Sequence, residues 1–131
     1  MRPRTTDPIL VKLIEDYPVV FNGEKPWCSS NGYEHGWAVL IRELCDELTE
    51  ILEVPGLVVM AQIKEKFAFL RWYMDWNRDI PRDEVKWERC QAAIARAEAK
   101  SGVTCETCGA AGTQRTGGWI KTLCDTCAEA R

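Results

Sequence analysis

The sequence predicts an α+β fold in which two long helices flank a β-hairpin and a small cysteine-rich module follows. Three observations support this prediction. Apolar residues recur at helical spacing in two long segments, and the segment between them alternates apolar and polar residues. Four cysteines then lie in two close pairs near the C-terminus. We expect residues 1–102 to form the core domain and residues 103–131 to form a module packed on it.

The N-terminal segment predicts one short helix and a loop. Apolar residues recur at helical spacing over residues 8–17, and Pro18 is expected to end this helix. Residues 19–36 contain several glycine, proline and asparagine residues. They therefore predict an irregular loop, anchored by aromatic side chains such as Phe21 and Trp27.

The clearest helix in the sequence covers residues 37–53. Its apolar residues form one continuous face, which is the pattern of a helix that packs on a core. Its other positions are mostly acidic and include Glu43, Glu47 and Glu50. Pro55 and Gly56 are expected to end it.

The next segment predicts a β-hairpin. Residues 57–63 and 68–76 alternate and are rich in β-branched and aromatic residues, which is typical of strands. We expect the two strands to pair around a turn at residues 64–67.

A second long helix is expected to open at Pro81 and to close at Gly102. In the tail, residues 113–115 and 119–123 predict two short strands around a pair of glycines. A short terminal helix is expected to follow the last cysteine pair.

The cysteine spacing predicts a metal site. Four of the seven cysteines follow the pattern Cys105-x2-Cys108-x15-Cys124-x2-Cys127. Two such pairs supply four thiolates in the tetrahedral arrangement that zinc prefers, and four cysteines leave no open position for water. The pattern therefore predicts one structural Zn²⁺ in a zinc-ribbon or treble-clef-like module. Cys45 and Cys90 are expected to be buried apolar residues, and no full ligand set joins Cys28 to His35.

Composition narrows the class of protein. With 17 basic and 20 acidic residues the formal charge is −3, which does not indicate a strongly basic nucleic-acid binder. No apolar run is long enough for a membrane span and no secretory signal is recognisable, so we expect a cytoplasmic protein. No nucleotide-binding loop, nucleophile elbow or carboxylate pair is recognisable either, so an enzyme is the less favoured class.

Three features of the sequence are candidate binding surfaces. The first is the acidic face with Glu43, Glu47 and Glu50, which is either solvated or meets a basic partner. The second is a cluster of basic and aromatic residues on the hairpin, to which Lys121 of the cysteine module would add a phosphate contact. The third is the set of six tryptophans, most of them expected in the core, with Trp119 on the cysteine module as the exposed contact. The residues of the second and third features are Lys64, Lys66, Arg71, Trp119 and Lys121.

Several stretches of the chain resemble a family of small proteins that are often encoded in phages and prophages. These stretches are residues 36–45, 62–73 and 104–127, and the resemblance extends over about residues 8–131. Its distinctive core is Lys64-Glu65-Lys66-Phe67 followed by Leu70-Arg71 and an aromatic. The family usually has glycine after that phenylalanine, where Ala68 stands here, which leaves the need for a special backbone angle open.

The resemblance implies a phage origin more than an activity, because most members of the family have no assigned function. The cysteine tail is also locally similar to the zinc finger of the DksA/TraR regulators of RNA polymerase, without the long coiled-coil hairpin of that family.

Three functions follow as hypotheses. The first is a non-enzymatic phage-type accessory protein in the bacterial host cell. It would bind a host protein or ribonucleoprotein complex, and would inhibit a bacterial defence system such as CRISPR. The alternative is a nucleic-acid-binding regulator that uses the basic and aromatic hairpin together with the zinc ribbon. An enzyme with an unrecognised acid/base pair near Glu65 and Arg71 is the third, less favoured reading.

Overall fold

The structure is a computed structural model that describes residues 8–28 and 35–131, apart from the side chain of His35. It confirms the predicted α+β class. The helices are α1 (Pro8–Asp16), α2 (Pro18–Phe21), α3 (Ala38–Leu52), α4 (Glu84–Ser101) and α5 (Asp125–Glu129), with a 3-10 turn η1 (His35–Trp37) before α3. The strands are β1 (Trp27–Cys28), β2 (Val58–Lys66), β3 (Phe69–Trp76), β4 (Thr113–Arg115) and β5 (Lys121–Leu123).

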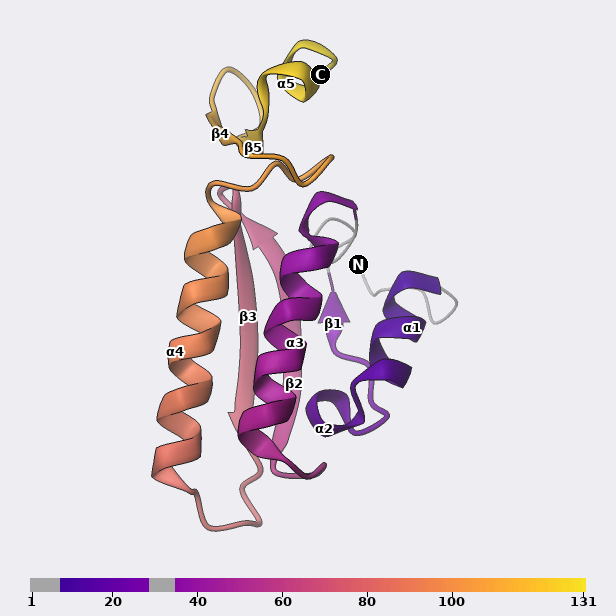
Figure 1. The fold of residues 1–131 in the computed structure, drawn as a ribbon, viewed down its shortest axis with the longest axis vertical. Coiled ribbons are helices and arrows are strands. Elements are labelled where there is room, and N and C mark those ends of the chain that lie inside the picture. The colour runs from indigo at the N-terminus through magenta and orange to yellow at the C-terminus, as the bar shows by residue number, and fades with distance from the viewer. Residues whose placement is uncertain (1–7, 29–34) are drawn as a thin grey trace.

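The core lies between the helices and one face of a three-stranded sheet of order β1-β2-β3 (Figure 1). The long helices α3 and α4 lie side by side on this face, and α4 packs against β3. Alternate residues of β3, namely Leu70, Trp72 and Met74, are buried under the helices, whereas Tyr73 between them is exposed. The predicted alternation therefore gives a sheet with one covered face.

The N-terminal segment differs from the prediction at two points. Pro18 ends α1 but also begins α2, because proline at the first helical position lacks only an N–H that would have no helical partner. Within the expected loop, Trp27 and Cys28 form β1, which pairs in parallel with Gln62 and Ile63 of β2. A strand of two residues is too short to show the alternation of apolar and polar residues by which a strand is predicted.

The hairpin turn is shorter than predicted. Lys64 to Lys66 belong to β2, and Lys66 pairs directly with Phe69, so the turn contains only Phe67 and Ala68. Both have positive φ, 51° and 70°, as in the type I′ turn that suits the twist of a two-residue hairpin. The left-handed angle is thus present at Ala68 although glycine is absent.

The second long helix begins later than predicted. Asp83 caps α4 by accepting a hydrogen bond from the backbone N–H of Lys86, at 3.1 Å, so the helix starts at Glu84 rather than Pro81. Gly102 is the C-cap as expected, but its φ of −69° is ordinary. Its missing side chain instead gives room to the ring of Phe69, since a Cβ there would lie 2.2 Å from that ring.

Residues 103–131, called the cysteine module below, lie at one end of the sheet beyond the hairpin turn (Figure 1). Strands β4 and β5 pair in antiparallel register from Thr113–Leu123 to Arg115–Lys121. Trp119, which was predicted to begin the second of these strands, lies instead in the loop before β5. The terminal helix α5 starts directly after Cys124 and contains Cys127, instead of following it. Across the described residues, no helix has the length and apolar character needed to cross a bilayer.

Candidate metal centre

Four cysteine side chains converge in the cysteine module. The Sγ atoms of Cys105, Cys108, Cys124 and Cys127 all lie within 4.8 Å of one another, and those of Cys108 and Cys124 are 3.6 Å apart. A disulfide would need about 2.05 Å, so the thiols are free. A tetrahedral ion with sulfur ligands at about 2.3 Å places its ligands roughly 3.8 Å apart. The donor set therefore fits a tetrahedral metal ion, and it matches the four residues that the spacing singled out.

The backbone around the first pair forms a tight knuckle. Gly109 has φ of +84° and its N–H donates to the carbonyl oxygen of Cys105, at 3.0 Å. The N–H of Cys105 in turn donates to the carbonyl of Ala110, at 2.7 Å. This turn favours a glycine, because a left-handed angle is costly for residues with a Cβ.

The second pair is arranged by the start of α5. Cys124 is the N-cap residue, and its Sγ accepts a hydrogen bond from the N–H of Cys127, at 3.4 Å. Such N–H donors stabilise a thiolate, so the local fold prepares this sulfur to act as a metal ligand.

The thiols influence one another's pKa values. Burial raises the pKa of Cys105, but backbone hydrogen bonds from Cys124, Cys108 and Thr107 outweigh this effect and lower it to about 6. The pKa of Cys127 is raised to about 12, chiefly by its hydrogen bond with the side chain of Cys124. Without a metal, the cluster therefore favours a state in which only one of the four cysteines is ionised. A cation at the centre would allow all four to ionise together.

The first knuckle docks on the start of α3. The N–H of Gly36 donates to the carbonyl of Glu106, at 2.8 Å, and the indole Nε1 of Trp37 donates to the carbonyl of Thr104, at 2.9 Å. A Cβ on Gly36 would lie 1.9 Å from the carbonyl oxygen of Cys105. The contact is therefore between backbones and requires glycine at this position.

A buried polar pair connects the module to the hairpin turn. The carboxylate of Glu106 accepts from the N–H of Thr122, at 2.7 Å, and the hydroxyl of Thr122 donates to the carbonyl of Ala68, at 2.8 Å. The side chain of Gln114 donates to the carbonyl of Phe67, at 3.2 Å. Burial raises the pKa of Glu106. Both carbonyls of the two-residue turn are thus held by the cysteine module.

These docking residues were not predicted from the sequence as parts of the site. Gly36 belongs to a segment with several glycines, and no sequence pattern distinguishes it from the others as a contact of the metal site. Glu106 directly follows Cys105, and Thr122 lies two residues before Cys124. That proximity is the only signal in the sequence that could have indicated them.

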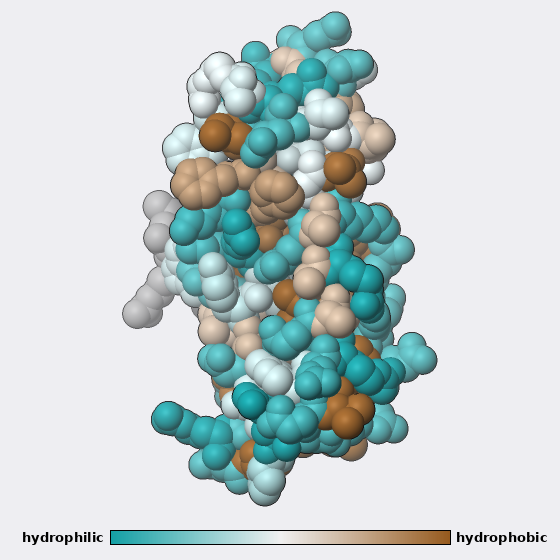
Figure 2. Space-filling view, turned by 90° about the vertical axis from the view of Figure 1, so that its left-hand side faces the viewer, coloured by the Kyte–Doolittle hydropathy of each residue, from teal (hydrophilic) through white to brown (hydrophobic). Residues whose placement is uncertain are grey.

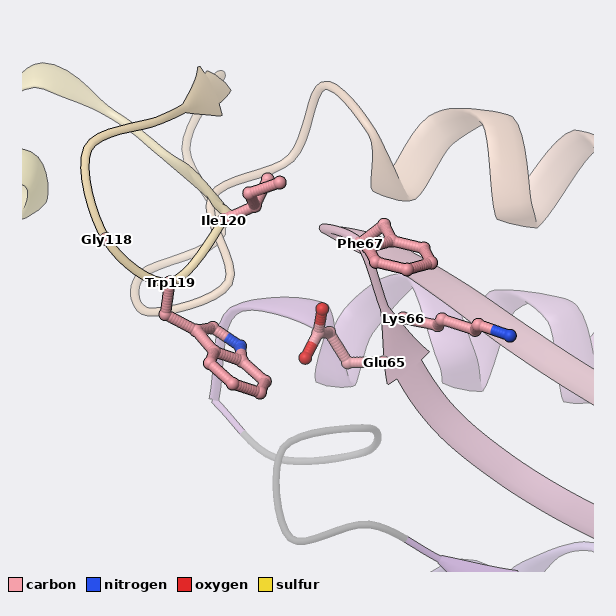
Figure 3. Close-up of a pocket in the computed structure, with 6 residues that line it drawn as sticks. All are labelled: Glu65, Lys66, Phe67, Gly118, Trp119 and Ile120. Carbon is pink, nitrogen blue, oxygen red and sulfur yellow. The ribbon is translucent and has the colours of Figure 1, made fainter.

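Two exposed aromatic side chains flank a hollow where the turn faces the module. Phe67 of the turn is 63% exposed and Trp119 of the module is 71% exposed. Together with Ile120 and Glu65 they line a space of about 390 Å³. The carboxylate of Glu65 points between the two rings, whereas Lys66 extends away (Figure 3). We call Phe67, Trp119 and Ile120 the aromatic patch, and Figure 2 shows hydrophobic side chains gathered below the module.

The predicted acidic face of α3 lies beside basic residues of α4. Glu43 pairs with Lys100 at 3.1 Å, and Glu47 pairs with Arg96. Glu50 lines a surface hollow with Glu47, Arg89 and Arg96. The acidic stripe is therefore partly balanced within the protein, and its role as a binding surface stays a prediction.

The predicted basic residues fall into two groups. Lys64 and Arg71 are cross-strand neighbours on the sheet face that points away from the helices, with Lys66 one row further on. Lys121 lies apart from them at the start of β5. The structure thus brings the hairpin cations together.

The remaining cysteines lie in the core. Cys28, Cys45 and Cys90 are all buried, in agreement with the sequence-based expectation for Cys45 and Cys90. Burial raises the pKa of the Cys90 thiol to about 11. These thiols are therefore poor nucleophiles and poor metal ligands. A site that joins Cys28 to His35 falls outside the description, because the His35 side chain is not described.

Comparisons with known protein families, with curated proteins and with solved structures found no match to this chain. The class that fold and site define is an α+β protein with a four-cysteine cluster able to hold a metal ion. Functional inference therefore rests on the geometry described above.

Proposed function

We propose that the four-cysteine cluster holds one zinc ion in a structural role. Four thiolates complete a tetrahedral zinc site and leave no position for a reacting water. Four thiolates and one divalent ion carry a formal charge of about −2, which the nearby hydrogen-bond donors help to stabilise. The ion would hold together a module whose two strands have three residues each.

We propose further that the chain is a non-enzymatic, phage-type accessory protein that binds a protein of the bacterial host. The observation that carries this proposal is the aromatic patch. Its two large rings, Phe67 and Trp119, are each more than half exposed and flank one hollow. Large exposed aromatics around a concave surface are typical of protein-binding hot spots.

The rigidity of the patch supports the same proposal. The carbonyl of Phe67 is held by Gln114, and the carbonyl of Trp119 accepts from Arg131. A patch whose backbone is already fixed loses little conformational entropy when a partner binds. The cysteine module thus keeps two aromatic side chains, from segments distant in sequence, at one place.

The biological setting follows from the resemblance to small phage and prophage proteins. We propose that the protein acts in the bacterial cytoplasm, on a host protein or ribonucleoprotein complex. Inhibition of a defence system such as CRISPR is the version to test first.

The test is affinity capture from nuclease-treated bacterial lysate, followed by titration of the purified partner. Trp119→Ala removes one ring, and Phe67→Asn removes the other while keeping a residue that tolerates positive φ. We expect each change to weaken partner binding at least about tenfold, because truncated hot-spot residues typically cost more than about 1.4 kcal/mol.

Val85→Ala is the matched control, since Val85 is a 68% exposed apolar residue on α4, outside the patch. Partner binding that both patch variants leave unchanged would exclude this surface. Normal phage resistance in CRISPR-competent cells that express the protein would exclude the defence version.

A further inference from the structure

The sheet has a second face, which points away from α3 and α4. We call it the open face, and we assign residues to it where the strand register places them on the same side of the sheet as the exposed Tyr73. These residues are Trp27, Gln62, Lys64, Lys66, Arg71 and Tyr73. The aromatic patch lies beyond the end of this face, at the turn and the cysteine module.

The open face is ordered in rows across the strands. Trp27, Gln62 and Tyr73 are aligned in one row that spans all three strands. Lys64 and Arg71 form the next row toward the turn, and Lys66 lies in the one after it. A row with two aromatic rings is therefore followed, toward the turn, by two rows that carry cations.

The cations of the open face lack protein counter-charges. In the part of the chain that the structure describes, no carboxylate pairs with Lys64, Lys66 or Arg71. On the helical side, by contrast, Arg42, Lys86, Arg96 and Lys100 all pair with acidic residues.

The placement of Lys64 opposite Arg71 is itself unfavourable. Like charges directly across an antiparallel pair destabilise a sheet. In addition, Nε of Arg71 is shielded from solvent and has no hydrogen-bond partner. A bound anion would relieve the repulsion, because it supplies negative charge where two cations face each other.

The aromatic side chains define which anion fits. Tyr73 is 44% exposed, and Nζ of Lys64 lies 5.7 Å from the centre of its ring. The same ring can carry a flat base while the lysine contacts the adjoining phosphate. The neighbouring Trp27 is half-buried and extends the flat surface across the sheet.

We propose that the open face binds single-stranded nucleic acid, with Lys64, Arg71 and Lys66 on phosphates and Tyr73 stacked on a base. The proposal does not rest on the proposed protein-binding patch, and only Lys66 borders both surfaces, with its Nζ 5.7 Å from the centre of the Phe67 ring. A flat, pleated face with an exposed ring suits unstacked bases, whereas duplex recognition needs an element that enters a groove. Asp75, exposed on β3 beyond Tyr73, limits the basic surface at the end far from the turn.

The experiment measures fluorescence anisotropy of a labelled 12-nucleotide oligo(U), an oligo(dT) and a 12-base-pair duplex with the full, zinc-loaded chain. We expect both single strands to bind more tightly than the duplex, with affinity that falls as salt rises from 50 to 200 mM. The double variant Lys64→Gln/Arg71→Gln should weaken binding at least about tenfold. It should also flatten the slope of log affinity against log salt by about 1.4, at roughly 0.7 per phosphate contact.

A pair of tyrosine variants tests stacking separately. Tyr73→Phe should keep the affinity, whereas Tyr73→Ala should lower it about fivefold or more. Arg82→Gln/Arg89→Gln removes the same charge from the α4 side and should have little effect. Trp119→Ala should not change oligonucleotide affinity, which separates this site from the aromatic patch. Thermal unfolding should show Lys64→Gln/Arg71→Gln to be as stable as the parent, since it removes a like-charge contact.

Absence of binding to either single strand at 50 mM salt would overturn the proposal. So would duplex binding that equals single-strand binding, or an equal loss in the Arg82→Gln/Arg89→Gln control. A protein captured through Lys64 and Arg71, without any oligonucleotide binding, would also overturn it and assign this face to a protein partner.

Discussion

The two residues of the hairpin turn combine an unusual backbone with close support from elsewhere. Phe67 and Ala68 both have positive φ, which is costly for residues that carry a Cβ. Their carbonyls accept hydrogen bonds from Gln114 and Thr122, and the N–H of Ala68 donates to the carboxylate of Glu65, at 2.9 Å. The surroundings therefore hold a conformation that the local sequence disfavours.

We expect Ala68→Gly to leave stability nearly unchanged, within about 0.5 kcal/mol, because relief of the left-handed angle is offset by loss of a fully buried methyl group and by a more flexible unfolded chain. The measurement is the free energy of unfolding in urea. Ala92→Gly, at an exposed position inside α4, is the control and should destabilise by about 1 kcal/mol. A loss of stability in Ala68→Gly as large as in the control would contradict the strain argument.

A second residue with a strict requirement is Gly36. Its Cβ would meet backbone atoms of Cys105, Glu106 and Gly109, none of which can rotate away. We expect Gly36→Ala to lower the free energy of unfolding by about 2–3 kcal/mol and to weaken metal binding, because the knuckle must shift. Urea unfolding and competition with a zinc chelator measure the two effects.

Gly102→Ala provides the comparison for Gly36→Ala. A Cβ on Gly102 would meet only the ring of Phe69, which can turn, and its φ is ordinary. Its effect on stability should be smaller and its effect on metal affinity negligible. Equal effects of the two changes on metal affinity would contradict a specific docking contact at Gly36.

At the scale of elements, the long helices and the hairpin could be predicted from periodicity, because each buries one long apolar face. β1 and α2 could not, since their few residues are placed by pairing with β2 and by packing on α3 rather than by local pattern. The start of α4 was also not predicted correctly, because the helix begins at Glu84 and not at Pro81. The capping contact of Asp83 competes with the general preference for proline at a helix start.

The acidic face of α3 allows a prediction about its ion pairs. Glu47 and Arg96 are both substantially exposed, so a double-mutant cycle with Glu47→Gln and Arg96→Gln should give a coupling of about 0.5 kcal/mol. This coupling should fall further in 0.5 M salt. A coupling above about 2 kcal/mol would show that the pair determines how α3 and α4 pack.

At the scale of the whole molecule, the metal site could be predicted from spacing because four ligands of one type must converge. Its attachment to the fold could not. The contacts through Gly36, Trp37 and Thr122 join segments far apart in sequence, and they depend on backbone positions that no motif encodes.

We expect metal removal to affect more than the cysteine module. Cys108→Ser should lose the metal, unfold residues from about 103 onward and raise hydrogen exchange at the Gly36 amide, because that amide is bonded to Glu106. Elemental analysis and hydrogen exchange measure these outcomes. Cys90→Ala, which removes a thiol outside the cluster, should keep one metal per chain. Full metal content in Cys108→Ser would refute the site.

The cysteine module follows, in the sequence, every element that it contacts. During synthesis, α3 and the hairpin therefore leave the ribosome before the residues that hold the turn exist. Until the module closes, the carbonyls of Phe67 and Ala68 have no partner from Gln114 or Thr122, and the turn is free to relax. Closure of the module is thus a late event in maturation, and a chain interrupted before it would carry the hairpin without its final shape.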